Sequence, residues 1–185
     1  MITKLGAAFA AAVSVVGMLA AAEVQAEEWN WTNPVIKEYG AVVPRPDAAL
    51  QPDKSAEYKV VFNVTVWATP DKVQPGLERV ARAVNLFASA GVPASRLHFI
   101  AVIHGPATPA VLDDSHYREK FSVDNPNVKL IAALKNAGVQ VVVCAQALAN
   151  FKFPDGWVDP DVEVTLAALT DLIILQQQGY ILVPL

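Results

Sequence analysis

Cysteine is almost absent from this chain, since its 185 residues contain only Cys144. A single thiol cannot form a disulfide within the chain, which excludes disulfide oxidoreductase chemistry between two cysteines of one molecule. Exported proteins usually hold their cysteines in pairs. Cys144 is therefore either a small buried hydrophobic residue or a group that is kept for its reactivity, and the sequence leaves both interpretations open.

Positive charge is also scarce, with 14 Lys and Arg against 18 Asp and Glu and a net charge of −4. Nucleic-acid-binding proteins usually present a clustered basic face, so nucleic acid is not an expected partner. The sequence has neither a Walker motif nor a glycine-rich dinucleotide motif. Nucleotide use is therefore not expected, and no cofactor is predicted.

The N-terminus carries an apolar run, Leu5–Ala22, which follows the positive charge of Lys4. Residues 24–26, Val-Gln-Ala, suit signal-peptidase cleavage before Glu27. We predict a cleavable signal peptide over residues 1–26, a periplasmic or secreted protein, and no membrane contact after cleavage. A retained membrane anchor is the alternative, because about 18 apolar residues are the lower limit for a bilayer span.

Residues 27–57, which we call the prelude, differ in composition from the rest of the chain. Trp29 and Trp31 lie close together, several prolines follow, and the segment has neither a helical nor a strand period. We predict an extended segment that packs its aromatic rings on the folded domain or on a neighbouring subunit. A partly disordered linker is the alternative, although two tryptophans are unusual in a disordered segment.

Residues 58–185 alternate between strand-like and helix-like segments. Apolar, β-branched runs predict strands at 58–64, 97–103, 139–143 and 180–185. Helices are predicted from about Pro75, at about 126–137, at 145–149 and from Asp159-Pro160 to Gly179, with a polar excursion at 113–118. The alternation predicts an α/β fold, a three-layer α/β/α arrangement around a parallel sheet of about five strands.

Two chemically capable residues follow strands of this sheet. His104 comes directly after 97–103, and Cys144 comes directly after 139–143. Ligands of open α/β sheets bind at the carboxyl ends of the strands, and sequential strands are usually neighbours, so we expect the two side chains along one edge. A helix that begins after Cys144 would favour its thiolate form. Gly105 would let a backbone or ligand come close.

Each of these residues also has a purely structural interpretation. Cys144 could be a buried and inert residue, and His104 could be a hydrogen-bonded loop histidine. His98 lies in the middle of a strand and is expected to be structural. His116 lies in the polar excursion and is expected to be solvated, with a place near the site as the alternative.

The order and spacing of several motifs resemble the DsrE/DsrF-like (YchN-like) family over residues 58–185. The motifs are Tyr58-Lys59-Val60-Val61-Phe62, the helix that contains Asn85, His104-Gly105-Pro106-Ala107, Gly138-Val139 before the strand that leads to Cys144, and Gln178-Gly179-Tyr180. The prelude, with its two tryptophans, is similar to that of exported members.

The resemblance implies a parallel sheet that is covered on both faces, and assembly into trimers or hexamers. In the sulfur-relay members of the family a cysteine carries sulfur as a persulfide, and by position that cysteine corresponds to Cys144. A thiol or a sulfur-donor protein is then an implied partner. Those members work in the cytoplasm, whereas this chain is expected to be exported, so the fold carries over more safely than the activity.

Three hypotheses about function follow, and the sequence does not decide whether the protein is an enzyme. The first is an exported persulfide carrier or sulfurtransferase-like protein, in which Cys144 accepts sulfur and His104 stabilises the anion or shuttles a proton. The second is a non-catalytic module that holds a small ligand or a soft metal at these two residues, with Gly105, Asn85 and His116 as further substrate-binding candidates. The third is a structural oligomer with a buried Cys144.

Overall fold

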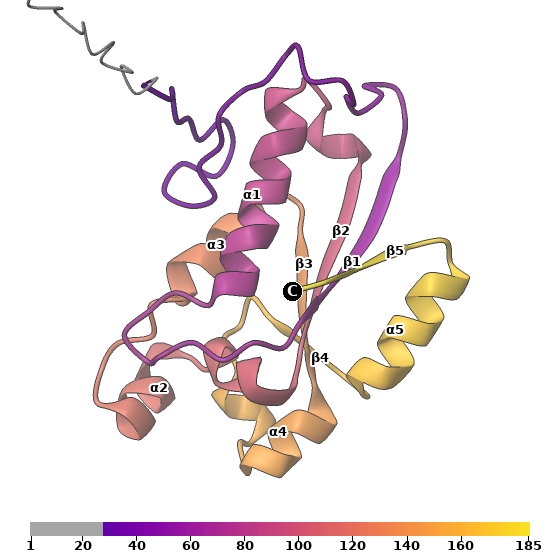
Figure 1. Cartoon of the computed structure of the whole chain (residues 1–185). Coiled ribbons are helices and arrows are strands. Elements are labelled where there is room, and N and C mark those ends of the chain that lie inside the picture. The colour runs from indigo at the N-terminus through magenta and orange to yellow at the C-terminus, as the bar shows by residue number, and fades with distance from the viewer. Residues whose placement is uncertain (1–27) are drawn as a thin grey trace, which may run out of the picture.

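A computed structural model describes residues 28–185, so the predicted signal peptide lies outside the described residues. Within 28–185, no helix combines the length and the apolar character that a bilayer crossing requires. The described chain contains one sheet of five strands with helices packed on it (Figure 1).

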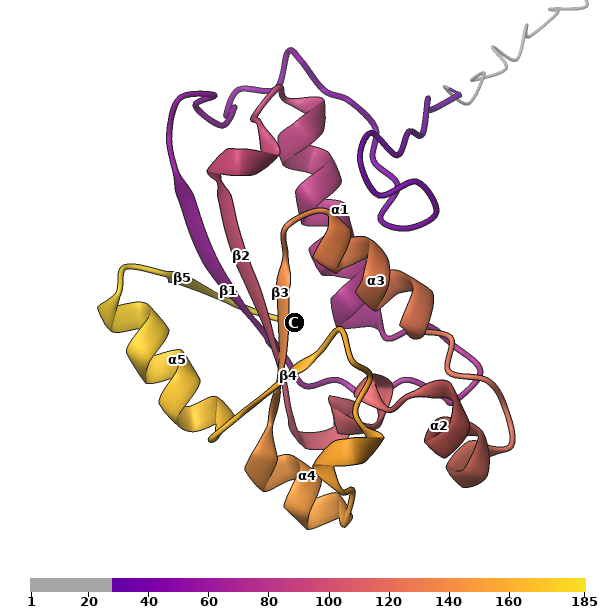
Figure 2. The same cartoon turned by 180° about the vertical axis from the view of Figure 1, so that it is seen from behind.

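The five strands are all parallel and lie in the order β4-β3-β2-β1-β5. They are β1 (Tyr58–Val64), β2 (Leu97–Ile103), β3 (Gln140–Cys144), β4 (Glu163–Thr165) and β5 (Ile181–Pro184). Helices α1 (Pro75–Ser89) and α3 (Val128–Asn136) cover one face, and α5 (Ala168–Gln177) covers the other (Figures 1 and 2). The predicted three-layer α/β/α fold with about five parallel strands is confirmed.

The two faces of the sheet bury different amounts of side chain. The face under α1 and α3 holds the larger cluster, which includes Phe99 and Leu134. The face under α5 holds a smaller cluster, which includes Val61, Val102 and Cys144. Because the central strands are covered on both sides, their residues are apolar at successive positions rather than at alternate ones.

Helix α1 shows how local signals set its bounds. The Gln74 side chain accepts a hydrogen bond of 2.7 Å from the Leu77 N–H, and Pro75 takes the first helical position, where a missing N–H costs nothing. After the helix, Gly91 adopts a φ of +85°, a left-handed conformation that glycine enters without strain. The predicted start at Pro75 agrees with the structure.

The segment after Asp159 differs from its prediction. Asp159-Pro160 opens a turn, in which the Val162 N–H donates to the Asp159 carbonyl at 2.9 Å, and β4 follows before α5 begins at Ala168. The predicted helix start was wrong because Asp and Pro also initiate turns. Leu169 on α5 is 73% exposed, so the apolar residues of this helix are not all buried.

The polar excursion is more ordered than the sequence pattern suggested. Asp113 caps a helix, α2 (Asp114–Phe121), by accepting a hydrogen bond of 2.9 Å from the His116 N–H. Between β2 and α2 lies a 3₁₀ segment, Gly105–Val111, and β3 runs directly into α4 (Ala145–Phe151). Two further 3₁₀ turns, Ala94–Arg96 and Asp155–Trp157, complete the helical elements of the described chain.

The prelude lies against α1 (Figure 1), and a short antiparallel bridge between Thr32 and Val42 closes a loop within it. Ile36 and Val42 are the prelude residues buried in the core, each 2% exposed. Trp29 and Trp31 are 48% and 60% exposed, so aliphatic side chains attach the prelude more than the indole rings do. Packing of those rings on a neighbouring subunit stays a prediction.

Candidate functional site

His104 follows β2 and Cys144 is the last residue of the neighbouring strand β3, at the same register. Ile103 on β2 is paired with Val143 on β3. The residues that come next, His104 and Cys144, therefore lie side by side at the carboxyl edge of the sheet. Both residues keep an extended backbone. Because side chains alternate along a strand, both lie on the face that α5 covers, as do Val102 and Val142.

The Cys144 side chain is nearly buried, with 6% exposure, and it packs in the apolar cluster beneath α5. Its Sγ accepts the Ala147 N–H at 3.4 Å, so the thiol group caps the first turn of α4. Ser, Asp or Asn usually fills that position. The structure therefore gives the sulfur one defined polar contact, and that contact comes from a backbone donor.

The imidazole of His104 is held by Asn63, a residue of β1. Its Nε2 lies 2.6 Å from Asn63 Oδ1. Partial burial lowers the pKa of His104 below its ordinary value of 6.5, which favours the neutral ring at neutral pH. With Asn63 Oδ1 as the acceptor, Nε2 carries the proton and Nδ1 keeps a free lone pair. His104 is thus suited to take up a proton rather than to supply a permanent positive charge.

Asn63 was not predicted as a site residue. The sequence signal that could have found it is a polar side chain inside the apolar run of β1, one residue before the strand ends. On a strand covered on both faces, such a residue needs a hydrogen-bond partner. The register of β1 and β2 supplies His104 as that partner.

Gly105 turns the chain away from the sheet after His104. Its φ is +55°, in the left-handed region, and no atom lies within 4 Å of the position that a Cβ would take. Its carbonyl accepts the Thr108 hydroxyl at 2.7 Å, which fixes the start of the 3₁₀ segment. The space beside Gly105 is open, as a ligand approach would require.

Asn85 lies on α1, on the opposite side of the sheet from Cys144, and is 0% exposed. Its Oδ1 accepts the N–H groups of Val35 and Ile36, and its Nδ2 donates to three carbonyls, those of Ile36, Tyr39 and Gly40. The side chain is therefore fully engaged in holding the prelude, away from the His104–Cys144 edge.

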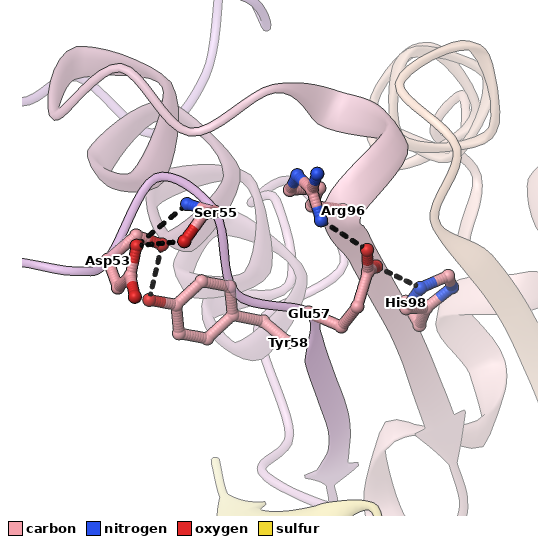
Figure 3. Close-up of polar contacts among 6 residues, drawn as sticks. All are labelled: Asp53, Ser55, Glu57, Tyr58, Arg96 and His98. Carbon is pink, nitrogen blue, oxygen red and sulfur yellow. Dashed lines mark hydrogen bonds and ion pairs between the residues drawn. The ribbon is translucent and has the colours of Figure 1, made fainter.

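His116 makes its contacts elsewhere as well. It lies on α2, with Nδ1 2.8 Å from Asp113 Oδ2 and its ring stacked on Trp157 at a centroid distance of 4.5 Å. His98 lies near the start of β2, at the other end of the sheet, where its Nε2 contacts Glu57 at 2.8 Å (Figure 3). Arg96 pairs with the second oxygen of the same carboxylate at 2.6 Å.

A metal centre receives little support from the described residues. Within 28–185, no group of three or more His, Cys, Asp or Glu side chains could hold a metal ion. His104 and Cys144 would offer two ligands, whereas a structural zinc site commonly uses four protein ligands.

A family model described as the DsrE/DsrF-like family matches residues 59–184. The chain belongs to the DsrE/DsrF-like family. The resemblance drawn from the motifs is confirmed, and the whole prelude lies outside the matched range. The chain is also similar to a solved structure, the protein of unknown function MTH1491 from Methanobacterium thermoautotrophicum.

That similarity has a TM-score of 0.51 at 14% sequence identity, and it covers 70% of this chain and 100% of the other. At this identity the likeness bears on the fold alone. No curated protein matches the chain. The family assignment and the geometry at the carboxyl edge of the sheet are therefore the basis for a functional proposal.

Proposed function

We propose that this DsrE/DsrF-like protein handles sulfur after export, with Cys144 as the sulfur-carrying residue. The family membership supports sulfur chemistry, because the family includes members that carry sulfur on a cysteine in sulfur relay. The observation that carries the proposal is the position of Cys144, the chain's one thiol, at the carboxyl end of β3 beside His104. Open α/β sheets bind their ligands at this edge.

The proposed reaction moves one sulfur atom without net oxidation. His104 Nδ1 takes the proton of the Cys144 thiol, and the thiolate attacks the outer sulfur of a donor persulfide, R–S–SH. The new Cys144–sulfur bond forms as the donor's S–S bond breaks, and the donor leaves as R–S⁻ with the electron pair. An acceptor thiolate then takes the outer sulfur by the same exchange and releases the Cys144 thiolate.

A structural role for Cys144 is the competing candidate, and a specific observation favours it. The side chain is 6% exposed within an apolar cluster, and its sulfur caps α4. Sulfur transfer requires a donor to reach Sγ from the carboxyl edge, where Gly105 leaves open space. The two candidates therefore differ in whether the native protein exposes the thiol to a reagent.

We also propose that the protein assembles with copies of itself, as trimers or hexamers by family resemblance. Helix α5 buries only Ala168 fully within the described chain, and apolar side chains around it remain exposed. They are Leu166, Leu169, Ile173, Ile174, Ile181 and Leu182. Exposed apolar side chains gathered on one helix and the strand beside it favour a protein–protein interface.

The test of the sulfur proposal is persulfide loading of the native, reduced protein. We expect incubation with glutathione persulfide to add the mass of one sulfur atom, as measured by intact-protein mass spectrometry. Cys144→Ser should add none. Subsequent incubation with a thiol acceptor should remove the added sulfur. Loading that occurs only after the protein is unfolded would assign Cys144 to the core and contradict the proposal.

A further inference from the structure

A hollow of about 520 Å³ lies between the prelude and the C-terminal end of α1, where β1 begins. Its walls are mostly apolar, and they come from Val43, Leu50, Tyr58, Leu86 and Phe87. This volume falls within the range of small-molecule sites in proteins. The hollow is at the opposite end of β1 from His104, so the proposed sulfur chemistry does not use it.

The aromatic wall of the hollow is fixed by packing. The Tyr58 and Phe87 rings lie 4.6 Å apart, and Phe87 rests in turn on the buried Phe99 at 5.6 Å. The Tyr58 hydroxyl donates to the Asp53 carbonyl at 2.9 Å, which ties this wall to the prelude (Figure 3). A wall that is already ordered loses little conformational entropy when a ligand binds.

The prelude side of the hollow is also held in place. The Gln51 amide donates to the carbonyls of Arg45 and Ala48, at 2.7 and 3.3 Å, and so closes the loop between them. The hollow is therefore bounded on both sides by segments that have defined hydrogen bonds. The wall that the prelude contributes lies outside the family match.

One cation lines the hollow and a second lies in an adjoining one. Arg45 lines the hollow and also lines the adjoining one of about 300 Å³, to which Lys54 contributes. The Arg45 guanidinium stacks on Trp29 at 5.1 Å, and the Lys54 side chain runs over Gly91 at the end of α1. Among the ion pairs within residues 28–185, none includes either cation.

One acid, Asp53, also lines the hollow, and its carboxylate is already engaged. Its Oδ1 accepts the N–H and the hydroxyl of Ser55, at 2.8 and 2.7 Å (Figure 3). These hydrogen bonds lower the pKa of Asp53 and keep it ionised. The hollow and its neighbour therefore present two cations without a carboxylate partner against one carboxylate that is turned toward Ser55.

We propose that this hollow binds a small amphipathic carboxylate. The apolar part of the ligand lies on Leu86, Tyr58 and Phe87, and the carboxylate pairs with Arg45, with Lys54 as a second cation. The planar guanidinium matches a carboxylate through two parallel hydrogen bonds, which fixes the orientation of the ligand. This site is independent of Cys144, so the protein would have a ligand site at each end of its sheet.

The test is titration calorimetry of the full mature chain with decanoate, below its micelle concentration, and with the neutral decanol. We expect decanoate to bind once per chain and decanol to bind about tenfold more weakly, because it lacks the charge-assisted hydrogen bonds. Arg45→Met should reduce decanoate affinity to the level of decanol. Leu86→Ser should weaken both ligands, since it removes part of the apolar wall.

Arg79→Met is the matched control, because Arg79 is an exposed cation on α1 that does not line the hollow. It should leave both affinities unchanged, and the melting temperatures of all three variants should stay near that of the native protein. Absence of decanoate binding would overturn the proposal. It would also be overturned if Arg45→Met bound decanoate as tightly as the native protein does. The same holds if the protein bound vesicles of anionic lipid but not monomeric decanoate.

Discussion

His104 and Asn63 are joined across β2 and β1 by a contact of 2.6 Å between Nε2 and Oδ1. Cys144 ends β3, which pairs with β2 on the side away from β1, and it lies at the register position beside His104. Asn63 thus contacts Nε2 of the histidine and makes no contact with Nδ1. This arrangement gives His104 a defined orientation and a free lone pair at the edge where the thiol lies.

Replacement of His104 by Gln should slow persulfide loading of Cys144 by about a hundredfold at pH 6.5, the lower end of general-base contributions. The effect should shrink toward pH 9, because hydroxide can then remove the thiol proton without help from the histidine. Asn63→Leu should slow loading less, since it removes the contact that orients His104 but keeps the imidazole that acts as the base. Equal loading rates at every pH would exclude His104 from the reaction.

The strands were predictable because both faces of the sheet are covered. Such strands are continuous apolar runs, and the predicted bounds of β1 and β2 are those observed. The edge strand β4 has three residues, two of them exposed, so it leaves no comparable pattern. Asp159-Pro160 then suggested a helix where the chain makes a turn.

The candidate site was predictable only at the level of topology. His104 and Cys144 follow the ends of apolar runs, and parallel strands bring such ends to one edge. The contact with Asn63 depends on the register between β1 and β2, which no local pattern sets. The burial of Cys144 depends on where α5 packs, and the apolar residues of α5 do not mark a single face.

The stability of the protein should fall with pH below neutrality because of His104. Burial lowers its folded pKa, so the unfolded state binds more protons once the pH falls through the unfolded value near 6.5. The free energy of unfolding should therefore decrease from about pH 7.5 toward the folded pKa. His104→Gln should flatten this part of the curve, measured by urea unfolding. His98→Gln, which removes an exposed histidine, is the control and should retain the slope.

Cys144→Ser and Cys144→Ala should differ in stability because of the cap on α4. The serine hydroxyl can accept the Ala147 N–H that Sγ now accepts, whereas alanine leaves that donor without its partner. We expect Cys144→Ala to lower the free energy of unfolding by about 1 kcal/mol relative to Cys144→Ser, as for other N-cap losses. Urea unfolding at pH 7 measures both variants. A serine variant less stable than the alanine variant would show that apolar packing outweighs the cap.

The proposed assembly predicts that charge on α5 should release monomers. Leu169→Glu with Ile173→Lys places two charges on exposed positions, and their i, i+4 spacing supports the helix itself. Light scattering should show an oligomer for the native protein at micromolar concentration and a monomer for this variant. Gln176→Glu, an exposed change on the same helix, should leave the oligomer intact. A native protein that is already monomeric would contradict the proposal.

Loss of the Asn85 side chain should detach the prelude from α1. Asn85→Ala removes the acceptor of two prelude N–H groups and the donor to three carbonyls, in a place where the side chain is 0% exposed. Each backbone group left unpaired in a buried place costs about 1–3 kcal/mol, but prelude groups that detach can find water instead. We therefore expect a loss of about 2–4 kcal/mol with local opening.

Limited trypsin digestion separates this local opening from global unfolding. Lys37 and Lys54 are exposed cleavage positions within the prelude, and Arg79 is an exposed one on α1. In Asn85→Ala, cleavage at the two prelude positions should accelerate more than cleavage at Arg79, because the prelude opens while α1 stays packed. Asn85→Asp, which keeps the acceptor and loses the donor, should give an intermediate rate. If all three positions accelerate equally, Asn85 supports the whole fold rather than the prelude attachment.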